Sequence, residues 1–280
     1  MLIEPVDIAS PLEAFAGVRR LKNPFIFSFG GYGKTGFSYV GADPVMEIRT
    51  DSGETTLTRG RNLYSYKDPF EAISGMLSDF KDIGNGPFPF NCGAAGYFSY
   101  ELKNIIEPSI FSRRHIACEV PGPAECSIGF YDPVYVHSHA EKRGYLVSIS
   151  EDRQRIKRFK DLLATGRLCN NRPAAIKKTA SGFTSNVTRD GYIGAIERAK
   201  GYISAGDIYQ INLSQRLAMP YEGDPFGIFQ RLLEKNPAPF RSFMDFGAFQ
   251  VISNSPERLL KIDDGAVETS PIKGTRPRGK

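Results

Sequence analysis

The sequence predicts an α+β fold in which antiparallel β-sheets pack on each other and helices flank them. Short strand-like runs dominate, and the helical segments come singly between them. Turn signals such as Asp51-Ser52-Gly53 join neighbouring runs as hairpins. A parallel sheet would instead require strands and helices in regular alternation, which this sequence does not show.

The first half of the chain is composed mainly of predicted strands. They cover residues 24–29, 37–40, 46–49, 55–58, 128–136 and 145–149. One helix is predicted from Asp68, a capping residue, with Pro69 at its first position. Its expected apolar face is Phe70, Ile73, Met76, Leu77 and Phe80. A second helix is expected to bury Ile156, Phe159, Leu162 and Leu163 and to end near Gly166.

A polar stretch without periodicity separates two parts of the chain. Residues 167–187 are small or polar and contain no helical or strand pattern, which is typical of a connection. We therefore expect an N-terminal domain over 1–170, a linker over 171–187 and a second domain over 188–280.

The second domain begins with a helix that Thr188 can cap and Gly206 can end. Its predicted inner face is Tyr192, Ile196, Ala199 and Ile203. Residues 208–217 then alternate as a strand, with Gln210, Asn212 and Ser214 on one face. Such uncharged polar side chains suit a cavity that binds a ligand, although a mildly polar edge strand has the same pattern.

The remaining residues predict one more helix and four strands. Asp224-Pro225 opens the helix and Asn236-Pro237 ends it, with Phe226, Phe229 and Leu233 inward. Strand-like runs follow over 240–246, 249–253, 259–262 and 266–269. We expect these strands to lack partners within this chain and to leave exposed edges.

Composition excludes several classes of protein. Among 280 residues, 41% are hydrophobic and 24% are charged, which are ordinary globular values. No apolar run reaches the length of a membrane span, and the N-terminus lacks the pattern of a signal peptide, so we expect a cytoplasmic protein. The formal net charge of +5 comes from interspersed charges, which predicts neither nucleic-acid nor membrane binding. The cysteines show no C-x-x-C pair that would indicate zinc.

Three further motifs have more than one interpretation. Gly33-Lys34-Thr35 resembles the end of a phosphate-binding loop, but Ser28 stands where that motif needs glycine. Glu257 and Arg258 follow an apolar strand and could act in chemistry or form a surface ion pair. Lys273 ends an alternating strand before Gly274, so it could be a nucleophile, an anion contact or an ordinary solvated lysine.

Three segments together resemble the chorismate-utilising enzymes. They are Gly206 to Arg216 (GDIYQINLSQR), Ser255 to Arg258 (SPER) and Pro271 to Thr275 (PIKGT), in the order and spacing of that family. Gly93 to Leu102 (GAAGYFSYEL) resembles an N-terminal segment of the same family. The likeness runs from about residue 20 to the end of the chain.

The residues at two positions distinguish the members of this family from one another. Isochorismate-type enzymes carry a lysine where this chain has Gln210, and anthranilate synthases typically carry alanine where it has Lys273. The combination resembles aminodeoxychorismate synthase component I. Anthranilate synthases also carry a Leu-Leu-Glu-Ser-like feedback motif near the N-terminus, and Phe27-Ser28-Phe29-Gly30 in this sequence lacks its glutamate, so the sequence does not predict tryptophan regulation.

The resemblance implies a reaction and roles for individual residues. Chorismate and glutamine-derived ammonia would give 4-amino-4-deoxychorismate for para-aminobenzoate and folate synthesis, with a glutamine amidotransferase subunit as partner. Lys273 would be the nucleophile and Glu257 the general acid or base, while Gln210, Asn212, Ser214 and Thr275 would bind substrate. Mg²⁺ is the implied cofactor, and its expected ligands lie beyond Lys280.

Two alternatives to this function remain open. One is anthranilate synthase component I, which would release pyruvate. The other is a non-catalytic fragment that acts only as a binding lobe, because the family continues beyond the last residue of this chain.

Overall fold

The computed structural model describes residues 1–30, 36–80, 86–110, 123–166, 182–272, 274 and 277. The chain divides into two compact units. Unit 1 comprises Met1–Pro173 and Phe229–Lys280, and unit 2 comprises Ala174–Ile228. Within the described ranges, no helix is long and apolar enough to cross a membrane.

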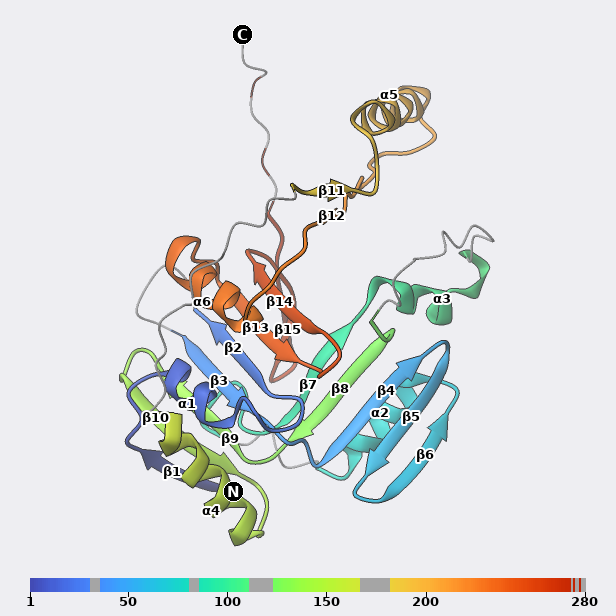
Figure 1. Cartoon of the computed structure of the whole chain (residues 1–280). Coiled ribbons are helices and arrows are strands. Elements are labelled where there is room, and N and C mark those ends of the chain that lie inside the picture. Colours follow the sequence, from blue (N-terminus) through green and yellow to red (C-terminus); the bar gives the residue numbers. More distant parts are fainter. Residues whose placement is uncertain are drawn as a thin grey trace. The chain divides into compact units, whose positions relative to one another are not determined.

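The larger sheet of unit 1 has seven strands in the order β1-β10-β9-β3-β2-β13-β14, all paired antiparallel (Figure 1). Its strands are β1 (Leu2–Val6), β2 (Phe25–Phe29), β3 (Phe37–Gly41), β9 (Val134–Ser138), β10 (Arg143–Ser148), β13 (Phe240–Asp245) and β14 (Gln250–Ser255). The predicted class of antiparallel α+β fold is confirmed.

The second sheet of unit 1 has five strands in the order β6-β5-β4-β8-β7. They are β4 (Met46–Asp51), β5 (Glu54–Arg59), β6 (Asn62–Tyr66), β7 (Gly93–Phe98) and β8 (Cys126–Tyr131). The predicted hairpin between β4 and β5 turns at Ser52 and Gly53, whose φ angles are 54° and 81°. Positive φ at both central residues matches the right-handed twist of the strands.

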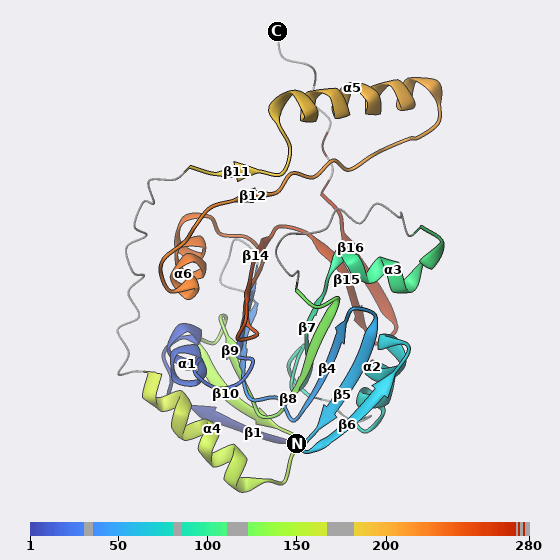
Figure 2. The ribbon, with the colours of Figure 1, turned by 45° about the vertical axis from the view of Figure 1, so that its right-hand side comes forward.

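The two sheets face each other across an aromatic core (Figure 2). Phe25 and Tyr39 from the larger sheet and Tyr131 at the end of β8 are buried there, and partly buried phenylalanines pack around them. The rings of Phe25 and Tyr131 meet edge to face, with centroids 4.7 Å apart. Such pairs add stabilisation beyond the apolar area that they bury.

Helices cover the outer faces of both sheets in unit 1 (Figure 2). On the larger sheet, α1 (Pro11–Val18) packs against α4 (Arg153–Thr165), which begins at Asp152 and buries Phe159 and Leu163 as predicted. On the smaller sheet, α2 (Pro69–Ser78) begins at the predicted Asp68 cap. Of its predicted apolar face, Met76 is buried and Ile73 and Phe80 are partly buried against the core. Phe70 and Leu77 are exposed instead, and Ala72 is buried in addition. The short α3 (Lys103–Ile106) follows β7.

The predicted strand over 128–136 is wrong, because the chain changes sheets in the middle of it. Residues before Asp132 form β8 in the five-stranded sheet, and residues after Pro133 form β9 in the seven-stranded sheet. Pro133 has no N–H to continue a ladder. The buried Asp132 carboxylate instead accepts hydrogen bonds from Ser148 Oγ (2.7 Å) and the Ile149 N–H (3.2 Å). These contacts fix the corner that joins the two sheets.

The expectation that every strand after residue 240 lacks a partner is also wrong. β13 pairs with β2 along its length, from Phe240 opposite Phe29 to Met244 opposite Phe25, and β14 pairs with β13. Of the described strands after residue 240, only β15 (Arg258–Asp263) and β16 (Ala266–Ser270) stand outside the larger sheet, and they pair with each other. Both are largely exposed, with Leu259 at 82% and Ile262 at 71%.

Unit 2 contains one long helix and a very short sheet. α5 (Arg189–Ala205) begins at Thr188 and ends at Gly206, as predicted, with Gly206 in the left-handed conformation (φ 82°). Only Ala199 of its predicted inner face is buried. β11 (Thr184–Ser185) pairs with β12 (Leu217–Ala218), and α6 (Pro225–Lys235) begins at the end of this unit and continues into unit 1.

Candidate functional site

The predicted substrate strand over 208–217 forms only at its last residue. Residues 208–216 are irregular, and the regular pairing is confined to Leu217 and Ala218. A strand needs a neighbour for its backbone N–H and C=O groups, and within the described residues of unit 2 that neighbour is only the two-residue β11. The prediction of a full strand here is therefore wrong.

Side chains and backbone just before β12 hold the end of this segment in place. Gln215 Nε2 donates to Ser185 Oγ at 2.9 Å, and the Arg216 N–H donates to Asn186 Oδ1 at 2.9 Å. The Asn186 N–H in turn donates to the Arg216 carbonyl at 3.1 Å. These bonds explain why the backbone becomes regular at residue 217.

The predicted substrate side chains of unit 2 are exposed. Gln210, Asn212 and Ser214 all face solvent, and so do the apolar residues that alternate with them, including Tyr209 at 95%. No described residue of unit 2 covers these polar side chains. Their role in binding substrate therefore stays a prediction.

Glu257 lies in the turn that joins β14 to β15 in unit 1. Ser255 Oγ accepts a hydrogen bond from the Glu257 N–H (3.2 Å) and donates one to the Glu257 carbonyl (3.0 Å), which closes the turn. The Glu257 side chain is exposed. A serine turn of this kind fixes the backbone and leaves the carboxylate available.

Arg258 has a structural role in the same hairpin. Its guanidinium forms an ion pair with Glu268 on β16 and lies 4.9 Å from the ring centroid of Phe240. The ion pair and the cation–π contact together join the β15–β16 hairpin to β13. Among the described residues, the ion-pair partner of Arg258 is thus Glu268 and not the neighbouring Glu257.

The β15–β16 hairpin sets the position of Glu257 in unit 1. Arg258 is paired with Ser270, so Glu257 stands beside the end of β16. Lys273 follows Ser270 by three residues in the chain. Lys273 and Thr275 themselves lie outside the described residues, as does the loop Gly33-Lys34-Thr35.

A second polar cluster, which the sequence analysis missed, crosses the larger sheet. We call it the polar row: Arg241, Ser28, Ser38, His137 and His139. Arg241 pairs with Ser28, Ser28 with Ser38, and Ser38 with His137, on four adjacent strands. The signal in the sequence is a serine between aromatic residues, as in Phe27-Ser28-Phe29.

Hydrogen bonds link the polar row from strand to strand. Arg241 Nη2 donates to Ser28 Oγ at 3.3 Å, and Ser38 Oγ lies 3.2 Å from Ser28 Oγ and 2.8 Å from His139 Nε2. Burial lowers the pKa of His139, and the neighbouring Arg241 lowers it further. Burial also lowers the pKa of His137, with His139 as the second cause. Both imidazoles are therefore held neutral inside the protein.

The described cysteines and acids do not build a metal centre. Cys92 and Cys126 are free and buried, and burial raises the pKa of Cys126 to about 11. Within the described ranges, no group of three or more His, Cys, Asp or Glu side chains could hold a metal ion. The sequence resemblance places the Mg²⁺ ligands beyond Lys280, so the described residues do not test them and they stay a prediction.

Residues 23–280 match the family model of the chorismate binding enzymes. The chain belongs to this family. Among its members, anthranilate synthase component 1 of Acetivibrio thermocellus is 29% identical over 98% of this chain and 59% of its own length. Aminodeoxychorismate synthase component 1 of Salmonella typhimurium is 32% identical over 86% of this chain and 52% of its own length. The chain thus spans about half the length of the curated relatives it matches.

A solved structure supports the fold. Anthranilate synthase component I from Streptococcus pneumoniae superposes with a TM-score of 0.69 at 22% identity, over 94% of this chain and 60% of that chain. The family resemblance inferred from the sequence motifs is confirmed, as is the fold. The relatives carry two different names, so they do not by themselves select one activity within the family.

Proposed function

We propose that this chain is part of an aminodeoxychorismate synthase component I, which exchanges the C4 hydroxyl of chorismate for an amino group. The single observation that carries this proposal is Lys273 in Pro271-Ile272-Lys273-Gly274-Thr275, combined with Gln210 in the earlier motif. A chain of the anthranilate synthase type would carry a small apolar residue in place of Lys273. A chain of the isochorismate type would carry a base for water in place of Gln210.

Lys273 acts in this proposal as a nucleophile on the chorismate ring. Covalent attachment divides one difficult displacement into two easier steps, because the amine first displaces the hydroxyl and ammonia then displaces the amine. A lysine with its reference pKa of about 10.4 is almost fully protonated at neutral pH, so the site must favour the neutral amine.

Glu257 acts as the general acid and base. As an acid it protonates the departing hydroxyl, and as a base it then accepts a proton from the incoming ammonia. The β14–β15 turn supports this role, because it leaves the Glu257 carboxylate exposed beside Ser270, the last residue of β16. Lys273 follows Ser270 by three residues in the sequence. Gln210, Asn212, Ser214 and Thr275 contact the substrate in the same proposal. Mg²⁺ supplies charge neutralisation for the substrate carboxylate when bound, and a glutamine amidotransferase supplies ammonia.

The test uses the whole gene product that contains these 280 residues. It is incubated with chorismate, an ammonium salt and Mg²⁺, and the products are separated by chromatography and mass spectrometry. We expect 4-amino-4-deoxychorismate without release of pyruvate. Anthranilate with stoichiometric pyruvate would overturn the proposal in favour of anthranilate synthase.

A variant pair tests the role of Lys273. Lys273→Ala should lower the rate of aminodeoxychorismate formation by at least about 10²-fold, since the attacking group is lost. The matched control is Lys261→Ala, which removes a half-buried lysine of β15 whose ion pair, among the described residues, is with Asp263. The control should retain its rate. Equal rates for both variants would show that Lys273 is an ordinary anion contact.

A further inference from the structure

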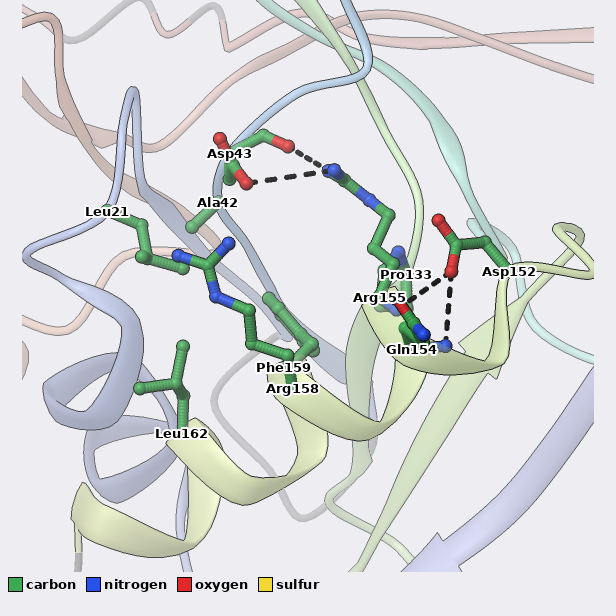
Figure 3. A pocket seen from close by; sticks show the side chains of 10 residues that line it. All are labelled: Leu21, Ala42, Asp43, Pro133, Asp152, Gln154, Arg155, Arg158, Phe159 and Leu162. Atoms are coloured by element: carbon green, nitrogen blue, oxygen red, sulfur yellow. Dashed lines mark hydrogen bonds and ion pairs between the residues drawn. The ribbon is translucent and has the colours of Figure 1, made fainter.

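A groove of about 280 Å³ lies on the outer side of unit 1, where α4 meets the loops that follow α1 and β3 (Figure 3). Leu21, Phe159 and Leu162 give it an apolar wall. The volume is close to the lower end of the range for small-molecule sites, about 300 Å³. The groove therefore has room for a ligand built on a single ring.

Most of the charges at the groove are satisfied by the protein itself. Arg155 Nε donates to the Asp132 carbonyl at 2.7 Å, and the same guanidinium contacts the carbonyl and the carboxylate of Asp43. The Asp152 carboxylate accepts the N–H groups of Gln154 and Arg155 at the start of α4. These bonds hold the rim of the groove in one arrangement.

Arg158 differs from Arg155, one turn earlier on the same helix. Its guanidinium extends across the groove toward Leu21 and Ala42 (Figure 3). Among the described residues it has neither an ion pair nor a hydrogen bond, whereas Arg155 has three polar contacts. The groove thus combines an apolar wall with one guanidinium, that of Arg158, which makes no hydrogen bond or ion pair within the described part of the chain.

We propose that this groove binds a small monocarboxylate with a single-ring body, such as an aromatic acid. The carboxylate pairs with the Arg158 guanidinium, whose planar fork matches two carboxylate oxygens. The ring lies against Leu21, Phe159 and Leu162, which exclude water from the pair. All of these residues belong to unit 1, and the inference does not rest on the proposed function.

The experiment uses the 280-residue chain and benzoate as the probe. Ligand-observed NMR measures the dissociation constant, with benzamide and acetate titrated separately. We expect saturable binding of benzoate. Benzamide, which keeps the ring but lacks the charge, should bind about tenfold more weakly or worse. Acetate, which keeps the charge but lacks the ring, should not displace benzoate at equal concentration.

Variants identify the binding residue. Arg158→Gln should weaken benzoate binding by about tenfold or more, because a charge-assisted pair is lost. Gln154→Glu should also weaken it, since it adds a negative charge to the lining without removing a side chain from the core. The matched control Lys157→Gln removes a neighbouring exposed cation that does not line the groove, and it should bind as the parent does.

Several outcomes would overturn the inference. They are the absence of saturable benzoate binding up to millimolar concentrations, equal binding by Arg158→Gln and the parent, and equal competition by acetate. The thermal midpoint of each variant is measured alongside, so that weakened binding counts only for a variant that unfolds at the same temperature as the parent.

Discussion

At the scale of single residues, the polar row shows how a sheet can carry polar side chains under its covering helices. Each serine hydroxyl is shared between neighbours on adjacent strands, which avoids the cost of an unpaired buried group. Hydrogen bonding is incomplete at the β13 end of the polar row. Arg241 Nε and Asn254 Oδ1 are buried and have no hydrogen-bond partner among the residues that the structure describes, and these two residues are paired across β13 and β14.

The first prediction concerns pH and stability. Because the folded protein lowers the pKa values of His137 and His139, the unfolded chain binds more protons as the pH falls below about 6.5. The stability that depends on neutral histidines is present above that pH and is lost on acidification. Urea unfolding should therefore give a smaller free energy of unfolding at pH 5.5 than at pH 7.5. Exposed carboxylates, with reference pKa values of about 4, remain ionised over this range.

Arg241→Met separates the effect of charge from that of burial. Removing the guanidinium should raise the pKa of His139 toward its ordinary value, measured from the pH dependence of its imidazole proton signals. Since burial remains, the recovery should be partial. An unchanged titration midpoint in this variant would show that Arg241 does not act on His139.

Individual site residues were predictable only where a motif names them. Glu257 and Arg258 could be singled out because they sit together in a recognisable segment, and the structure adds that Arg258 serves the hairpin. Arg158 could not be distinguished from the other cations on its helix. Its position depends on the loop at Leu21 and on Ala42, which are over a hundred residues away in the sequence.

At the scale of elements, the crossing of α1 and α4 depends on close backbone approach. A Cβ atom on Gly17 would lie 2.1 Å from the Leu162 carbonyl oxygen, and one on Gly166 would lie 1.8 Å from the Glu13 carbonyl oxygen. Neither backbone atom can move away as a flexible side chain could. Both positions therefore require glycine for the helices to pack as they do.

The second prediction follows from that crossing. Gly17→Ala should lower the free energy of unfolding by about 1–3 kcal/mol, the usual cost of overpacking, as measured by urea denaturation. The control is Gly201→Ala in α5, where nothing lies within 4 Å of the added atom. That substitution should stabilise the protein by up to about 1 kcal/mol through helix propensity. If Gly17→Ala left the free energy of unfolding unchanged, α1 and α4 would be able to move apart at no cost.

Helix starts and ends were easier to predict than helix faces. Asp68, Thr188 and Gly206 mark boundaries through local hydrogen bonds or backbone conformation, which a short stretch of sequence determines. The buried face depends on what packs against it, and α5 buries only Ala199 despite a regular apolar pattern. The strand over 208–217 failed for the same reason, because alternation cannot supply the neighbouring strand.

At the scale of the whole molecule, unit 1 is built from two separated stretches of chain. β2 lies between β3 and β13, so a strand from the start of the sequence is completed by one from near its end. The rings of Phe29 and Phe240 meet edge to face across this junction. Phe15 of α1 meets Phe243 of β13 in the same way. No local pattern predicts such a pairing. The domain boundary predicted at 171–187 stays a prediction, and the return of the chain to the first sheet was missed.

The third prediction tests this discontinuous arrangement. Replacing residues 174–228 by a flexible Gly/Ser linker should leave a folded unit 1, with near-ultraviolet circular dichroism and a cooperative thermal transition. Its matched comparison is the chain ending at residue 173, which lacks β13 and β14 and exposes the edge of β2. The shorter chain should unfold at a lower temperature and aggregate more readily. Equal stability of the two proteins would show that the β2–β13 pairing contributes little.

The pairing of β2 with β13 also has a consequence for the newborn chain on the ribosome. At synthesis rates of about 5–20 residues per second, β13 is made roughly 10–40 s after β2, from which it is separated by about 210 residues. During that interval β3 can already pair with one edge of β2. The other edge of β2 presents unpaired backbone N–H and C=O groups beside its phenylalanine rings. Two nascent chains on one messenger could then join through this edge. We therefore expect slow translation through residues 30–240 to favour paired, misassembled chains, unless a chaperone holds β2 until its partner emerges.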